Sequence, residues 1–90
     1  MFVSFTDWEF DGDVDNAVES AKGFWPAMKK HGATNMRMTV TGDKTIRTMT
    51  VWSSEEKLKA NIDEVRAAAA SAAGMTSTGG MMGALAVELD

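Results

Sequence analysis

The stretch that decides the fold is residues 34–52, TNMRMTVTGDKTIRTMTVW, where two runs of alternating polar and apolar residues flank a glycine. Alternation with a period of two is typical of β-strands. Gly42-Asp43 between the runs indicates a tight turn. We therefore predict a β-hairpin with strands at 34–40 and 45–52. Its predicted cross-strand pairs are Val40 with Thr45, Met38 with Arg47, and Met36 with Met49.

An amphipathic helix is predicted on the N-terminal side of this hairpin. Apolar residues recur every three or four positions from Val14 to Met28, which is the spacing of one helix face. Asp13 is the predicted N-cap, and Gly32 lies where a glycine commonly ends a helix. Pro26 cannot donate a backbone hydrogen bond, so we expect the helix to kink or restart just before it.

A second helix is predicted on the C-terminal side. Ser53-x-x-Glu56 is a capping box at its start, and Gly74 is the expected end. The apolar stripe of this helix consists of Leu58, Ile62, Val65, Ala69 and Ala72. Its predicted solvated face consists of Lys57, Lys59, Asp63, Glu64 and Arg66.

Further strands are predicted at residues 1–8 and 81–89, which gives the order β-α-β-β-α-β over a single domain, residues 1–90. This order suits an α+β fold of the ferredoxin-like kind, with a four-stranded antiparallel sheet and both helices on one face. The predicted helix-facing residues are Val3, Phe5, Met36, Met38, Val40, Met49, Val51, Leu85 and Val87.

The opposite, open face of the predicted sheet then carries both Trp8 and Trp52, with Phe2, Ile46 and Met82. Such an apolar area is larger than soluble monomers usually expose. A second copy of the chain is the simplest cover, so we expect a homodimer.

The composition narrows the classes of function. The chain has 13 Asp and Glu against 9 Lys and Arg, one His and no Cys, with a net charge of -4. The lack of cysteine excludes disulfides, thiolate metal sites and cysteine nucleophiles. The negative charge argues against a nucleic-acid partner. No targeting signal is recognised and the apolar run at 67–75 is too short to cross a membrane, so we expect a cytoplasmic protein without a membrane partner.

Two features of the sequence, an acidic segment and a single histidine, give only weak indications of a metal site or of acid-base chemistry. DGDVDN at 11–16 resembles the start of a calcium loop, but Asn16 and Lys22 stand where such a loop needs Gly and Glu. Helix capping explains these acids, so we expect no metal. His31 is the only imidazole, so any histidine acid-base chemistry must use it. The simpler interpretation of His31 is a cation at a helix C-terminus, and no cofactor is expected.

The segments TMTVWSSEE (48–56) and MKKHGATNMRM (28–38) resemble the corresponding strand-to-helix and helix-to-strand segments of the dimeric α/β-barrel superfamily. This resemblance implies the ferredoxin-like fold and the homodimer. The superfamily includes cofactor-free antibiotic-biosynthesis monooxygenases, small isomerases, haem-degrading enzymes, stress-response proteins and members of unknown role, so it implies fold more than activity.

One set of residues is the candidate ligand site, because strand alternation places all of them on the open sheet face. The set is Trp8, Asn35, Arg37, Thr48, Thr50 and Trp52. Aromatic walls with a few polar groups suit a small-molecule pocket, in which Arg37 could hold an anionic or enolate oxygen and Asn35 could donate to it. Some monooxygenases of the superfamily use Asn, Trp and Arg inside the barrel.

Two functions therefore remain open. One is a small-molecule-binding barrel, similar to a cofactor-independent monooxygenase or isomerase that acts on an enolisable or aromatic compound. The other is a non-enzymatic structural or stress-related dimer, in which Trp8 and Trp52 are interface packing and Arg37 pairs with Glu88 or with a carboxylate of the partner. A large enclosed cavity at the tryptophans would favour the first function, and solid packing would favour the second.

Overall fold

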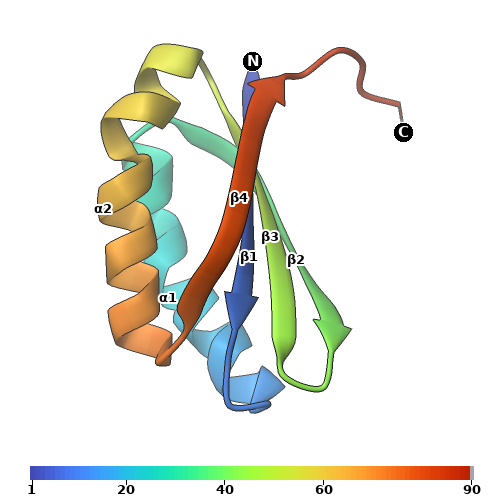
Figure 1. Ribbon diagram of the computed structural model, residues 1–90. Helices are drawn as coiled ribbons and strands as arrows, with labels where there is room; N and C mark the ends of the chain where they lie inside the picture. Colours follow the sequence, from blue (N-terminus) through green and yellow to red (C-terminus); the bar gives the residue numbers. More distant parts are fainter. Residues whose placement is uncertain (90) are drawn as a thin grey trace.

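The computed structural model describes residues 1–89 and has the predicted order β-α-β-β-α-β. Its elements are β1 (Phe2–Glu9), α1 (Val14–Lys30), β2 (Ala33–Gly42), β3 (Thr45–Trp52), α2 (Glu55–Ala73) and β4 (Thr76–Ala84). The strands form one antiparallel sheet in the order β2-β3-β1-β4. Both helices lie against the same face of this sheet (Figure 1). The ferredoxin-like α+β fold is therefore confirmed.

Helix α1 begins and ends where the sequence predicts. The Asp13 side chain accepts a hydrogen bond from the backbone N–H of Asn16 at 3.0 Å, and Gly32 follows the helix with a φ of +105°. Of the expected kink or restart before Pro26, the restart is wrong, because α1 is continuous through the proline. Lys22, whose carbonyl loses its helical donor to the proline, is exposed and open to water.

Helix α2 begins one residue later than predicted. Its N-cap is Ser54, not Ser53, and the Ser54 hydroxyl accepts a hydrogen bond from the backbone N–H of Lys57 at 3.2 Å. The predicted end at Gly74 is confirmed, with a φ of +64° that glycine adopts without strain. Neither helix is long and apolar enough to cross a membrane.

The last strand occupies residues 76–84, not the predicted 81–89. It ends at Ala84 because Ala84 pairs with Phe2, the first residue of its neighbour β1. One more hydrogen bond follows, from the Leu85 N–H to the Met1 carbonyl at 3.0 Å. No residue of β1 then remains for the next residues to pair with. Residues 85–89 extend away from the helices (Figure 1).

The hairpin forms as predicted, but its predicted register is wrong by one residue. The observed pairs are Val40 with Ile46, Met38 with Thr48, and Met36 with Thr50. The register shifts between Val40 and Gly42, where β2 has an extra residue next to the turn. Because side chains alternate between the two faces, this shift reverses the predicted facing of β3 relative to β2.

The predicted assignment of faces is therefore wrong for β1 and β3, and also for β4, where Met82 was predicted on the open face but pairs with the helix-facing Ser4. The residues that face the helices are Phe2, Ser4, Thr6, Trp8, Ile46, Thr48, Thr50 and Trp52. Met36 and Met38 of β2 face the helices, as predicted. The open face instead carries Val3, Phe5, Met49, Val51 and Met81, which alternate with the helix-facing residues along β1, β3 and β4.

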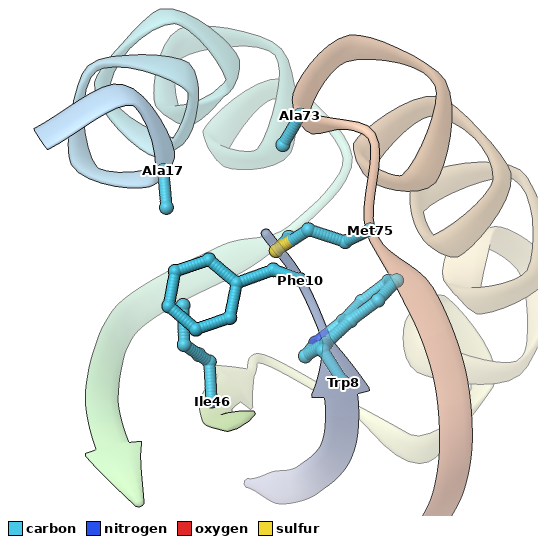
Figure 2. Packing of buried hydrophobic residues seen from close by; sticks show 6 residues of the cluster. All are labelled: Trp8, Phe10, Ala17, Ile46, Ala73 and Met75. Atoms are coloured by element: carbon cyan, nitrogen blue, oxygen red, sulfur yellow. The ribbon is translucent and has the colours of Figure 1, made fainter. Parts of the chain in front are cut away.

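Two apolar clusters join the helices to opposite ends of the sheet. The first contains Trp8, Phe10, Ala17, Ile46, Ala73 and Met75. Figure 2 shows that its aromatic rings lie between the sheet and the helix residues Ala17 and Ala73. The second contains Met28, Ala33, Trp52, Leu58 and Ile62. Each cluster includes one of the two sheet tryptophans, so both indoles belong to the core of the single chain.

An ion pair crosses the open face of the sheet. Arg47 Nε donates to Asp7 Oδ1 at 2.8 Å and its second amino group donates to Asp7 Oδ2 at 3.1 Å, while the guanidinium lies over the Phe5 ring at 5.8 Å. The hydrogen bonds from Arg47, together with its charge, lower the pKa of the Asp7 carboxyl below its ordinary value of 3.8, against the opposing effect of burial.

This lowered pKa predicts a pH dependence of stability. A carboxyl with a depressed folded-state pKa stabilises the fold above its ordinary pKa and loses that contribution as the pH falls through the folded value. As the pH is lowered below about 4, the free energy of unfolding of the wild type should fall. We expect a smaller fall in Asp7→Asn. Urea denaturation at a series of pH values measures this, with Asp63→Asn on exposed α2 as control. Parallel curves for the wild type and Asp7→Asn would contradict the prediction.

Candidate functional site

A cavity of about 50 Å³ lies between the helices and the sheet. Its floor consists of alternate residues of the two central strands, which are Ser4, Thr6 and Trp8 of β1 and Thr48, Thr50 and Trp52 of β3. Because β1 and β3 are antiparallel, Trp8 and Trp52 come from opposite ends of this row. Apolar residues of α1 and α2, among them Phe24 and Val65, form the roof.

Hydroxyl side chains occupy the centre of the floor. Ser4, Thr6 and Thr50 are only 2–5% exposed. The Trp8 indole N–H donates to Thr48 Oγ1 at 3.0 Å. The Trp52 indole N–H donates to Ser4 Oγ at 3.1 Å. Each indole is therefore fixed by a hydroxyl of the neighbouring strand, and the cavity has a polar floor between two aromatic ends.

Arg66 of α2 brings a positive charge to this cavity. It is half-buried, and its Nε donates to Thr6 Oγ1 at 3.0 Å. A longer contact of 3.5 Å joins its amino group to the Phe5 carbonyl. The predicted placement of Arg66 on the solvated face of the helix is therefore wrong. The signal was in the sequence, since Arg66 is four residues after Ile62 and so lies on the same helix face.

A larger open groove of about 500 Å³ adjoins the cavity at the edge of the sheet. It lies between α1 and β2, and its lining includes Trp25, Lys22 and Asn35. Ala21, Met36 and Met38 line both the groove and the cavity. Unbranched methionine side chains change rotamer readily, so they are suited to be a movable partition between the two spaces.

The structure divides the predicted site residues among three places. Trp8, Thr48, Thr50 and Trp52 do come together, but under the helices and not on the open face. Asn35 lines the edge groove. Arg37 is exposed and pairs with Met49 in the ladder, which places it on the open face, away from the cavity. The predicted placement of Asn35 and Arg37 on one sheet face with the tryptophans is therefore wrong.

The cavity offers no conventional acid-base group. Of the residues that the structure describes, Arg66 is the only ionisable one that lines it, and His31 is exposed at the C-terminus of α1. Within residues 1–89, no group of three His, Cys, Asp or Glu residues is placed to hold a metal ion. Asp11 and Asp13 are engaged by backbone N–H groups of the turn and helix start, as capping predicts.

No protein-family model matches the sequence, and no curated protein matches it. Solved structures do match. The cofactor-independent oxygenase SnoaB from Streptomyces nogalater superposes with a TM-score of 0.71 at 13% identity, over 98% of this chain and 96% of SnoaB. The monooxygenase ActVA-Orf6 of Streptomyces coelicolor, solved with the ligand nanaomycin D, gives 0.57 at 16% identity, over 99% and 92%.

A third match is a dimeric ferredoxin-like protein from an uncultured marine organism, with a TM-score of 0.63 at 11% identity over 100% of this chain and 99% of that protein. At these identities the likeness concerns the fold. Because the matches run over nearly the full length of both chains, they support the resemblance drawn from the sequence. The chain therefore shares the ferredoxin-like subunit fold of these solved structures.

Proposed function

We propose that the protein binds a small, largely apolar organic molecule between its helices and its sheet. The observation that carries this proposal is the hydroxyl floor, because four hydroxyl residues occupy central positions where a structural core would hold Val, Ile or Leu. Buried hydroxyls stabilise a core poorly, since each must be hydrogen-bonded to offset its desolvation. A floor that keeps them between two indoles is suited to orient a ligand.

The chemistry that fits this site is one in which the substrate supplies the reactivity. With Arg66 as the only ionisable lining residue in the described part of the chain, the cavity binds and positions better than it transfers protons. An enolisable aromatic substrate can react with O₂ through its own carbanion, so that a CH₂ group becomes C=O and water is released. The oxygenases that share the fold are consistent with this reaction class.

Ligand entry would use the edge groove. The cavity of about 50 Å³ accepts only water-sized groups, whereas the groove of about 500 Å³ has the size of a ligand pocket. Rotation of the shared residues Met36 and Met38 would join the two spaces. The ligand body would then lie partly in the groove, with its polar end on the hydroxyl floor.

The proposal is tested with an anthrone as probe and the matched variants Thr50→Val and Thr39→Val. Each replaces a hydroxyl with a methyl of similar size, but Thr50 lines the cavity and Thr39 is exposed on β2. We expect Thr50→Val alone to weaken binding, by roughly 3- to 10-fold for one lost hydrogen bond. Calorimetry measures binding, and an oxygen electrode measures O₂ uptake by the complex.

A non-enzymatic dimer is the second candidate. The observation that favours it is the volume of the cavity between helices and sheet, about 50 Å³, which is well below the several hundred Å³ usual for ligand pockets. No binding of the anthrone to the wild type, with unchanged or higher stability of Thr50→Val, would favour this candidate over the first. Binding without O₂ uptake would leave a binding protein and reject the oxygenase.

In both candidates we propose that a second copy of the chain covers the open face of the sheet. That face carries the apolar residues Val3, Phe5, Met49, Val51 and Met81. The prediction of a dimer from the sequence rested on Trp8 and Trp52, which the helices cover instead. Val3 and Val51 are already buried in the single chain and Phe5 and Met49 are half-buried, whereas Met81 is 59% exposed, so the cover is needed chiefly around Met81. A protein of the same fold is a dimer.

A further inference from the structure

The guanidinium of Arg66 is an unneutralised charge at the cavity. Residues 1–89 contain three ion pairs, Lys22 with Glu19, Arg47 with Asp7 and Lys59 with Glu55, and none of them includes Arg66. Of the five N–H groups of an arginine, Arg66 directs one to Thr6 and one to the Phe5 carbonyl. The others remain for an acceptor. We propose that Arg66, together with Thr6, binds an oxyanion of the ligand, such as a carboxylate or an enolate oxygen.

The hydroxyls of the floor, like Arg66, are available as hydrogen-bond donors. The oxygens of Ser4, Thr6 and Thr48 each accept an N–H, from Trp52, Arg66 and Trp8 respectively. A hydroxyl that accepts in this way has its own proton left to donate. Among residues 1–89, no carboxylate lines the cavity to compete for these donors. A lining of donors without acids favours a ligand with acceptor oxygens and disfavours an ammonium group.

Gly80 of β4 leaves the space that the guanidinium occupies. A Cβ at this position would lie 2.6 Å from the Arg66 amino nitrogen and 3.0 Å from the Phe5 carbonyl oxygen. Any side chain here would therefore push the guanidinium away from the floor. Glycine weakens a strand, so its presence beside Arg66 fits a site in which the position of this charge matters.

The ligand class that follows is an aromatic or other apolar body that carries an oxyanion. The body contacts the aromatic and methionine residues of the cavity and groove, and the oxyanion meets Arg66 on the far side of the floor. This assignment rests on the proposed function, because it names the chemistry of the molecule that would occupy the same cavity.

The test compares 2-naphthoate with 2-naphthalenemethanol, which have the same ring system with and without the negative charge. Calorimetric titration is carried out on the wild type, Arg66→Met, Arg66→Lys, Gly80→Ala and the control Arg37→Met. Arg37→Met removes the same charge from the open face and so corrects for net charge. Circular dichroism and urea denaturation establish that each variant is folded.

We expect Arg66→Met to weaken naphthoate binding roughly 10- to 100-fold, as for a lost charge-assisted hydrogen bond, and to leave the alcohol unaffected. Gly80→Ala should weaken the acid selectively while it keeps the charge, which provides a test if Arg66→Met does not fold. Arg66→Lys should retain part of the affinity, and Arg37→Met all of it.

The outcomes separate this inference from the proposed function. If the alcohol binds the wild type and Arg66→Met binds the acid as tightly as the wild type does, the oxyanion site is wrong and the apolar cavity stands. Equal losses for acid and alcohol would show that Arg66 only supports packing, which also overturns the inference. If neither probe binds the wild type, the cavity proposal and the oxyanion site both fail.

Discussion

Trp52→Ala is expected to destabilise the single chain by about 3–5 kcal/mol, the usual cost of removing a large aromatic side chain from a core. Trp52 is completely buried and packs in a cluster with Met28, Ala33, Leu58 and Ile62. Its removal also takes the indole donor from Ser4. Small domains have only about 5–15 kcal/mol of total stability, so the variant should be largely unfolded at moderate urea concentrations.

Two variants make the result specific. Trp25→Ala removes a half-buried indole from α1, so its loss should be much smaller. Trp52→Phe keeps an aromatic ring but leaves the Ser4 hydroxyl without its donor, and about 1–2 kcal/mol is expected. Urea denaturation followed by circular dichroism measures all three. A loss in Trp52→Ala that depends on protein concentration would instead place this indole at a subunit interface, as the sequence-based prediction did.

The misplacement of Trp52 shows where prediction from the sequence ends. Alternation in TIRTMTVW divides the residues of β3 into two correct sets, and the element order places two helices on one face of the sheet. Which set faces the helices depends on long-range packing. Met36 and Met38 were correctly placed, but the extra residue beside Gly42 shifted their partners in β3 by one. Neither the size nor the apolar character of the side chains distinguishes the two faces, because both contain aromatic, Val and Met residues.

The candidate site was predicted only in part, and the shift in hairpin register explains most of what was missed. Thr48, Thr50 and Trp52 share a face in any register, since they alternate along β3. Trp8 joins them through the pairing of β1 with β3, and all four line one cavity. Asn35 and Arg37 were predicted on the same face because of the predicted hairpin pairing. The observed pairing differs by one residue, so they do not share that face. Arg66 was missed because a charged residue on a helix is usually solvated, although its spacing from Ile62 indicated an inward position.

Met81→Asp is expected to convert a dimer into a monomer. Met81 lies on β4 beside Phe5, on the open face of the sheet, and is 59% exposed in the single chain. An aspartate there stays hydrated in the monomer, so the subunit should keep its stability. In a dimer that closes over this face, the carboxylate would be buried without a partner, and we expect the dissociation constant to rise at least about 30-fold.

The matched control is Val40→Asp. Val40 is 48% exposed, so it starts from a comparable environment, but its pairing with Ile46 places it on the face that the helices cover. Sedimentation velocity at several micromolar concentrations should show a dimer for the wild type and Val40→Asp, and a monomer for Met81→Asp. A wild type that is monomeric throughout would reject the dimer. Dissociation by Val40→Asp alone would mean that subunits associate through the hairpin end, and not by closing sheet against sheet.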